Sequence, residues 1–241
     1  MCKQTSRKRF VIIARAALAA RRDPLLKGKR RRAVALCALA RASNPLVRAA
    51  RHFALVCRHK TYVFLYCAYA GMPFRGFMHD WSKFSPVEFF ESVRYFTGRR
   101  SPVGLCREIE GRSLGWLHHK GRNKHHFEYW HDSVDASGSP LPTPNAIRPI
   151  PMPFRYALEM LCDTIAASRA YNGGKFSYDL LEKWWRTRQG APVNMAASTK
   201  RFCDLAYAEM KRDGNCSALR RARELFDRAE AEIRAESQEE N

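Results

Sequence analysis

Half of the eight histidines in this chain of 241 residues fall in one short stretch, WLHHKGRNKHHFEYW, over residues 116–130. Two histidine pairs are separated there by three cations. Imidazole nitrogens bind transition metals, whereas the cations favour an anionic ligand, because the stretch would otherwise repel itself. The residues concerned are His118, His119, Lys120, Arg122, Lys124, His125 and His126. We expect one histidine of each pair to bind a metal and the other to orient a substrate or to support the metal ligands; the alternative is a cationic loop that binds phosphate without metal.

Histidine and aspartate also recur in a defined order on both sides of this stretch. His59 stands alone, His79 and Asp80 are adjacent in MHDWSK, and Asp163 follows in EMLCDTIAAS. Imidazole and carboxylate ligands without thiolate suit Mn, Fe, Zn, Ni or Co. Adjacent residues point about 100° apart on a helix. His79 and Asp80 therefore meet one ion only at a helix end, or serve two different ions, so we expect one or two ions.

Each of these residues also has a structural interpretation without metal. His59 would then be a hydrogen-bonded helix histidine, and Asp80 would cap the turn that follows it. Asp163 lies in an apolar helix, where a buried carboxylate needs a metal, a cation or hydrogen bonds. Its partner would be Arg155 or Arg169.

Lysine and arginine side chains near the histidines are candidate contacts for phosphate. Lys83 follows Asp80 by three residues, about one helical turn. With Lys120, Arg122 and Lys124 it forms the predicted substrate-binding set, although an exposed lysine explains Lys83 equally well.

Charge is concentrated at the start of the chain, which carries +20 in total. Residues 1–50 contain fourteen Lys or Arg and a single acid, Asp23. Such a block attracts nucleic acid, an acidic membrane face or a phosphorylated ligand, or it is a solvated tail. Residues 1–22 also resemble an organelle presequence.

Other features of composition favour a cytoplasmic protein without a membrane span. The longest apolar run, residues 61–74, is short and contains Gly71 and Pro73. The cysteines form no CxxC pair, which indicates reduced thiols rather than a cysteine zinc site or a disulfide framework.

Helical periodicity dominates, and no segment alternates as a strand does, which predicts an all-α protein. Helices are expected over residues 33–42, 45–70, 77–83, 86–97, 107–119, 154–171, 179–187, 199–211 and 217–236. Ser85 and Glu88 form an expected capping box. Residues 133–153 should form a long surface loop. We divide the chain into a basic extension (1–50), a metal-binding helical domain (51–190) and C-terminal helices (191–241), the last of them charged.

The motifs resemble two families. MHDWSK looks like the HD-x-x-K element of the HD superfamily of helical metal-dependent phosphohydrolases, with His59 as its preceding histidine and Asp163 as its distal aspartate. The two further histidine groups look like those of dinuclear members. HDWSKFSPVEF, HHKGRNKHHFEYW and MPFRYALEMLCDTIAA resemble more closely a bacterial group without a settled activity, over about residues 59–171.

The resemblance implies an HD-like bundle that hydrolyses a small phosphate ester, such as a nucleotide, with Asp80 and Lys83 as catalytic residues. Asp80 would bind metal and orient the attacking water. A non-haem di-iron oxygenase with the same ligand order is the first alternative. The second is a non-enzymatic nucleic-acid-binding protein that uses residues 1–50 and the histidine-rich stretch.

Overall fold

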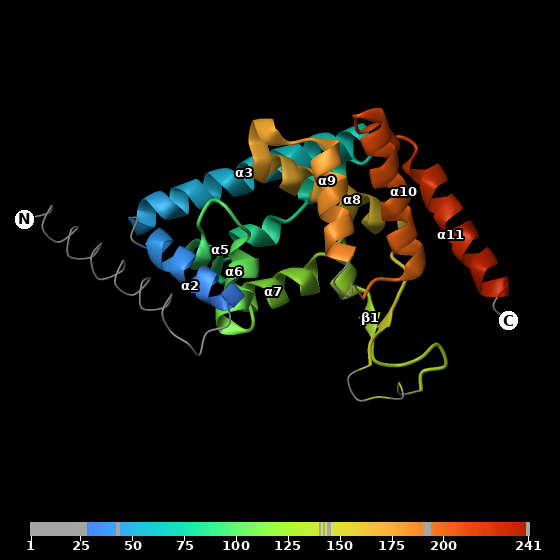
Figure 1. Cartoon of the computed structure of the whole chain (residues 1–241), viewed down its shortest axis with the longest axis horizontal. Helices are drawn as coiled ribbons and strands as arrows, with labels where there is room; N and C mark the ends of the chain where they lie inside the picture. The colour runs from blue at the N-terminus through green and yellow to red at the C-terminus, as the bar shows by residue number, and fades with distance from the viewer. Residues whose placement is uncertain are drawn as a thin grey trace, which may run out of the picture. The chain divides into compact units, whose positions relative to one another are not determined.

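The computed structural model describes residues 28–41, 44–139, 141, 143, 146–189 and 194–239 (Figure 1). Within these ranges ten α-helices dominate, and the only strands are two residues long, which confirms the predicted all-α class. The α-helices are α2 (Gly28–Arg41), α3 (Pro45–Tyr69), α4 (Pro73–Met78), α5 (Pro86–Tyr95), α6 (Pro102–Glu110), α7 (Leu114–Arg122), α8 (Phe154–Asn172), α9 (Tyr178–Gln189), α10 (Ala197–Asp213) and α11 (Ala222–Glu239). The 3-10 helices are η1 (Trp81–Phe84), η2 (Phe127–Tyr129), η3 (Gly173–Lys175) and η4 (Ser217–Leu219), and the strands are β1 (His131–Asp132) and β2 (Arg148–Pro149).

No helix in the described ranges combines the length and the apolarity that crossing a bilayer requires. The structure describes residues 28–41 and 45–50 of the predicted basic extension as parts of α2 and α3. The predictions of a targeting segment over residues 1–22, and most of the predicted nucleic-acid-binding arm, lie outside the described residues.

The described residues form two compact units. The N-terminal unit contains the residues up to Arg58 together with Trp81–Arg122, and the C-terminal unit contains His59–Asp80 together with the residues from Asn123 onward. The boundary at residue 58 lies inside α3. The domain limits predicted at residues 50 and 190 stay a prediction.

The N-terminal unit packs α2 and α5 against α6, and α5 against α7. Its small core contains Ala33, Cys37, Tyr95, Leu105 and Cys106, with Leu36 and Ile109 packed against it. The single helix predicted over residues 107–119 is wrong. Gly111 takes a left-handed conformation with φ 76° and ends α6, so α7 begins separately at Leu114. α7 continues through Gly121 and ends at Arg122.

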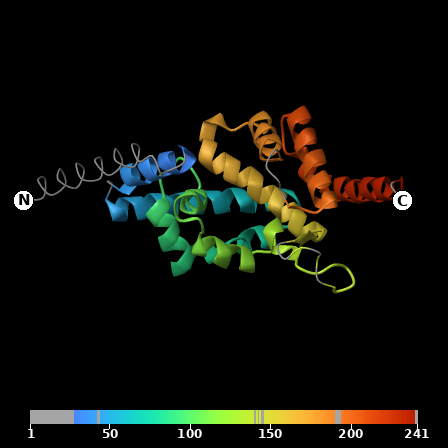
Figure 2. The ribbon, with the colours of Figure 1, turned by 60° about the horizontal axis from the view of Figure 1, so that its bottom comes forward.

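The C-terminal unit is built around α8, whose apolar face is buried. Leu158, Leu161 and Ile165 recur at helical spacing on that face and are at most 2% exposed. Phe202 and Tyr207 of α10 complete the centre of the core. Figures 1 and 2 show α10 and α11 side by side, in orange and red. The segment 133–153 begins just after β1 and holds β2, which pairs antiparallel with it.

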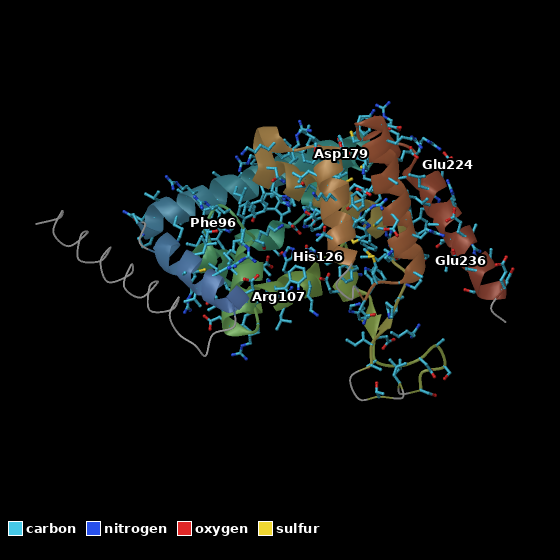
Figure 3. The ribbon with its side chains drawn as sticks, in the orientation of Figure 1. Phe96, Arg107, His126, Asp179, Glu224 and Glu236 are labelled. Carbon is cyan, nitrogen blue, oxygen red and sulfur yellow. The ribbon has the colours of Figure 1, made fainter. Side chains whose placement is uncertain are left out.

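The charged helix predicted at the C-terminus is present as α11. Ion pairs four residues apart join Arg223 to Asp227 and Arg228 to Glu232, and Arg201 of α10 contacts Glu236. Figure 3 draws the side chains of α11 as sticks and labels Glu224 and Glu236. Exposed pairs of this kind contribute about 0.3–0.5 kcal/mol each.

The helix predicted over residues 77–83 is wrong in its limits. Pro73 starts α4, which ends at Met78, and a separate 3-10 helix covers Trp81–Phe84. Between them Asp80 has φ 52°, in the left-handed region that breaks a helix. The break lies at the predicted metal-binding pair.

Candidate metal centre

The backbone around His79 and Asp80 is held by the packing of α4 on α3. Gly76 is buried there, and a Cβ on it would lie 2.7 Å from Cys67 Cβ and 2.9 Å from Phe64 Cα. Lys60 of α3 also donates hydrogen bonds to the carbonyl oxygens of Phe77 and His79. His79, which follows the last residue of α4, is therefore held in a fixed position, and the left-handed Asp80 turns its side chain back toward the imidazole.

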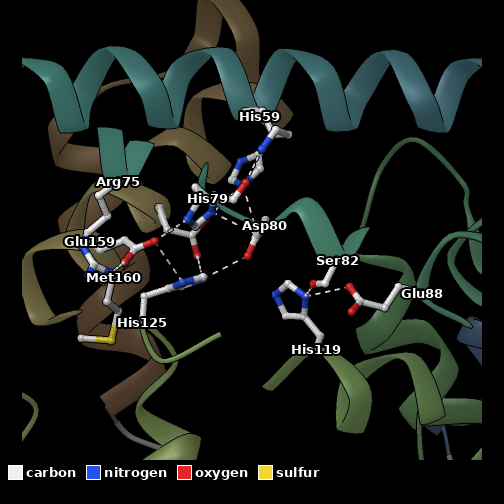
Figure 4. Close-up of polar contacts among 12 residues, drawn as sticks. His59, Arg75, His79, Asp80, Ser82, Glu88, His119, His125, Glu159 and Met160 are labelled. Carbon is white, nitrogen blue, oxygen red and sulfur yellow. Dashed lines mark hydrogen bonds and ion pairs between the residues drawn. The ribbon is translucent and has the colours of Figure 1, made fainter. Parts of the chain in front are cut away.

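Four predicted ligands of the C-terminal unit converge: His59 from α3, His79 and Asp80 from the end of α4, and Asp163 from α8. Figure 4 labels the first three of them. His59 Nε2 lies 3.1 Å from Asp163 Oδ1 and 4.0 Å from Asp80 Oδ2. His79 Nε2 lies 3.0 Å from Asp80 Oδ2 and 3.4 Å from Asp163 Oδ1. One donor atom from each residue falls within 4.8 Å of all the others, so the group can hold a metal ion.

Burial and charge make this group unusual. His79 and Asp80 are 2% and 1% exposed. Burial by itself lowers the pKa of His79, but Asp80 and Asp163 outweigh it and raise that pKa well above its ordinary value. Burial alone would raise the pKa of Asp163, yet His59 and His79 hold it well below the usual range. The Asp163 carboxylate thus stays ionised beside the two imidazoles.

The hydrogen bonding of His79 also fits a metal site. Among the described residues its buried Nε2 has no hydrogen-bond partner, although carboxylate oxygens lie close to it. A buried polar atom without a hydrogen bond is costly and calls for a partner. Among the described residues, Asp163 contacts neither Arg155 nor Arg169, the two partners that the sequence suggested for it. Arg169 instead donates a hydrogen bond to the hydroxyl of Tyr66.

A second group in the same unit contains His79, His125 and Glu159. His79 Nδ1 donates to Glu159 Oε1 over 3.0 Å, and His125 Nδ1 lies 3.4 Å from the same oxygen. Arg75 Nη1 donates to Glu159 Oε2 over 2.6 Å. Sequence reasoning missed Glu159 and Arg75. The signal was Glu159 standing four residues before Asp163, which places both carboxylates on one face of α8.

His125 joins the two groups, because its other nitrogen faces the aspartates. His125 Nε2 lies 3.4 Å from Asp80 Oδ1 and 3.9 Å from Asp163 Oδ2. The ring of His126 lies 4.3 Å from that of His125, centroid to centroid. The structure thus brings His59, His79, Asp80, His125, His126 and Asp163 together within the C-terminal unit.

His118 and His119 belong to the N-terminal unit, where they share one glutamate. His118 Nδ1 donates to Glu88 Oε1 over 2.6 Å, and His119 Nδ1 donates to Oε2 over 2.7 Å. Ser82 Oγ lies 3.2 Å from His119 Nδ1 (Figure 4). Burial raises the pKa of Glu88, but the hydrogen bonds from His119 and His118 outweigh it and lower that pKa.

The capping box predicted from Ser85 and Glu88 is therefore wrong. The Ser85 side chain makes no capping hydrogen bond, and its buried hydroxyl has no partner among the described residues. Glu88 is 4% exposed and is used by the two imidazoles of α7 instead. Glu88 thus joins α5 to α7 instead of forming a local cap with Ser85.

The predicted phosphate contacts are divided between the units. Lys83 lies in η1, and Lys120 and Arg122 lie on α7, all in the N-terminal unit. Lys124 belongs to the C-terminal unit, and its ammonium lies 5.7 Å from the centre of the Tyr129 ring.

The donor set fits a divalent transition metal. Nitrogen and oxygen donors come from three segments of one unit, and none of the described cysteines is among them. Such a set suits Mn, Fe, Zn, Ni or Co. The structure thus contains buried histidine and aspartate groups that can hold a metal ion, as the sequence predicted.

Comparison with curated proteins gave no match. Comparison with solved structures also gave none. The model of DUF5662, a family of unknown function, matches residues 48–223. That range covers nearly three quarters of the chain and includes all the predicted site residues. The chain therefore belongs to the DUF5662 family.

Proposed function

We propose that this protein is a metal-dependent phosphohydrolase with its centre in the C-terminal unit. One observation carries the proposal: His59, His79, Asp80 and Asp163, distant in sequence, bring their donor atoms within 4.8 Å of one another in an all-α protein. The order of these residues resembles that of the HD superfamily, and their identity supports a hard or borderline ion.

The residues of the group have different proposed roles. His59, His79, Asp80 and Asp163 would hold one ion, and a second ion would need further donors such as His125 and His126. When bound, such an ion supplies charge stabilisation at a phosphoryl oxygen and lowers the pKa of a water ligand. Asp80 has two oxygens and faces both His79 and His125. We assign it the further role of orienting the attacking water and accepting its proton.

The proposed substrate is a nucleotide or another small phosphate ester. Lys124 is the cation that we assign to the substrate phosphate in the C-terminal unit. Lys83, Lys120 and Arg122 stay predicted phosphate contacts, because a lysine or arginine pairs strongly with phosphate oxygens. Each of these residues can be replaced singly by glutamine. If its contact with the phosphate is equally strong in the ground state and in the transition state, the replacement should raise KM more than it lowers kcat.

The test begins with elemental analysis of the purified full-length protein. The apoprotein is then loaded with Mn, Ni, Co, Zn or Fe(II), and phosphate release from nucleotides and p-nitrophenyl phosphate is measured. Asp163→Asn should abolish metal binding and hydrolysis together. Asp227→Asn, a change of the same kind on exposed α11, should leave both unchanged.

Other outcomes would replace the proposal. Iron content with oxygen consumption and no phosphate release would favour the di-iron oxygenase. Steeply salt-dependent binding to RNA or DNA without tight metal would favour the nucleic-acid-binding alternative, since each neutralised phosphate adds to the salt slope.

A further inference from the structure

Glu159 lies on α8, four residues before Asp163, and is 5% exposed. We infer that Glu159 is the positioning residue of the metal centre: it orients His79 and His125 and is not itself a metal ligand. The inference rests on the proposed metal-binding role of the C-terminal unit. It does not depend on which reaction that centre catalyses.

The two imidazoles present opposite edges to Glu159 and to the aspartates (Figure 4). In His79, Nδ1 is 3.0 Å from Glu159 Oε1, and Nε2 is 3.0 Å from Asp80 Oδ2. In His125, Nδ1 is 3.4 Å from Glu159 Oε1, and Nε2 is 3.4 Å from Asp80 Oδ1. One carboxylate oxygen thus lies behind both rings, on the side away from the aspartates.

This arrangement selects one tautomer for both histidines. A carboxylate at Nδ1 keeps the proton there, so that Nε2 carries the lone pair that can bind an ion. It also makes the imidazole a stronger donor and prevents rotation of the ring. Both Nε2 atoms face the aspartates that approach His59, which defines one side of the group as the metal side.

The contact with Arg75 argues against Glu159 as a metal ligand. Its Nη1 donates to Glu159 Oε2 over 2.6 Å, and its guanidinium lies 4.6 Å from the centre of the Tyr156 ring. Arginine stays charged in proteins. A divalent ion on Glu159 would face this fixed cation at close range. The Glu159 carboxylate and the Nδ1 atoms of His79 and His125 therefore form a proton-bearing support rather than a second ion site.

The direct test uses Co(II), whose visible absorption reports the number and type of its ligands. Glu159→Gln should weaken Co(II) affinity by about 10- to 100-fold, the range observed when such supporting carboxylates are replaced. The absorption spectrum of the saturated protein should stay close to that of the wild type, because no ligand is lost. Glu159→Asp should recover part of the affinity.

Glu182→Gln is the matched control. Glu182 is 4% exposed in the same unit and is paired with Arg186 and Lys211, so its replacement also removes a buried charge. It should lower thermal stability and leave Co(II) affinity unchanged.

Two results would overturn the inference. A Glu159→Gln spectrum that shows one ligand fewer would make Glu159 a ligand, and an unchanged affinity with lower thermal stability would make its role purely structural. If the expected change in affinity is found while no phosphate is released from any ester, the proposed reaction fails and the inference stands.

Discussion

The side chains of His79 and Asp80 contact each other, with 3.0 Å between Nε2 and Oδ2, although the two residues are neighbours in the chain. Neighbours on a continuous helix diverge by about 100°. The contact exists because α4 ends at Met78 and Asp80 adopts φ 52°. A non-glycine residue in this conformation is uncommon, and such strain concentrates at functional sites.

Asp80→Asn separates the backbone role of this residue from its chemical role. Asparagine tolerates the left-handed conformation and keeps the shape but loses the charge. We expect the variant to fold and its metal affinity to fall by more than about 100-fold, beyond the range of a supporting residue. Isothermal titration measures the affinity. Asp80→Ala should in addition lose about 1 kcal/mol of stability from backbone strain; equal affinity in the wild type and Asp80→Asn would contradict a ligand role.

Metal addition should stabilise the folded protein. An ion present at 100 times its Kd contributes about 2.7 kcal/mol, which raises Tm by roughly 5–10 °C for a chain of this size. Differential scanning calorimetry with Mn, Co or Zn, and again after EDTA, gives the shift. His59→Gln should reduce the shift, whereas His131→Gln, whose Nε2 lies 2.6 Å from the Asn194 carbonyl oxygen, should not. Identical shifts in both variants would count against the metal centre.

His52 in the N-terminal unit should make stability depend on pH. Burial, followed by the charge of Lys83, lowers its pKa to about 4, whereas an unfolded histidine titrates near 6.5. Between these values the unfolded chain binds the extra proton, so stability falls as pH falls from about 6.5 to 4, by up to roughly 3 kcal/mol. His52→Leu should flatten this dependence in urea titrations. An equally steep profile in the variant would assign the effect to other groups.

Glu88 should be a strong stabilising residue of the N-terminal unit. Glu88→Ala leaves two imidazoles without their acceptor and should cost about 2–4 kcal/mol. Since its folded pKa is lowered, this contribution is present above its unfolded value and is lost as pH falls through the folded pKa. Glu108→Ala, which removes a more exposed partner of Arg100, should cost less than about 1 kcal/mol. Chemical denaturation compares the two.

Gly76 is predicted to be intolerant of any side chain. In Gly76→Ala the new Cβ would meet the backbone of Phe64 at 2.9 Å, so α4 must move. Overpacking of this kind costs about 1–3 kcal/mol, and the movement should weaken metal affinity because α4 carries His79. Gly174→Ala has open space around its Cβ and is the control. A Gly76→Ala protein with wild-type affinity would show that α4 does not position the site.

Much of the fold followed from periodicity and from glycine and proline positions. The apolar face of α8 and the end of α3 before Gly71 were predictable, since burial and chain breakers leave a local signal. The limits of α4 were not predictable, because the left-handed conformation of Asp80 depends on the packing of Gly76 against α3. The convergence of His59, His79, Asp80 and Asp163 followed from their order, whereas Glu88 was assigned to a cap because its imidazole partners lie on another helix.

The C-terminal unit is discontinuous in sequence: His59–Asp80 joins the unit that otherwise starts at Asn123. An ion bound by Asp80 and Asp163 would tie these two segments together, as a disulfide would. Cross-links that close long loops restrict the unfolded chain most, by about 4 kcal/mol or more for loops approaching 100 residues. Loss of the ion would then weaken the hold of the C-terminal unit on residues 59–80, although Val63 and Cys67 remain buried in its core, so that metal occupancy and the stability of the unit would vary together.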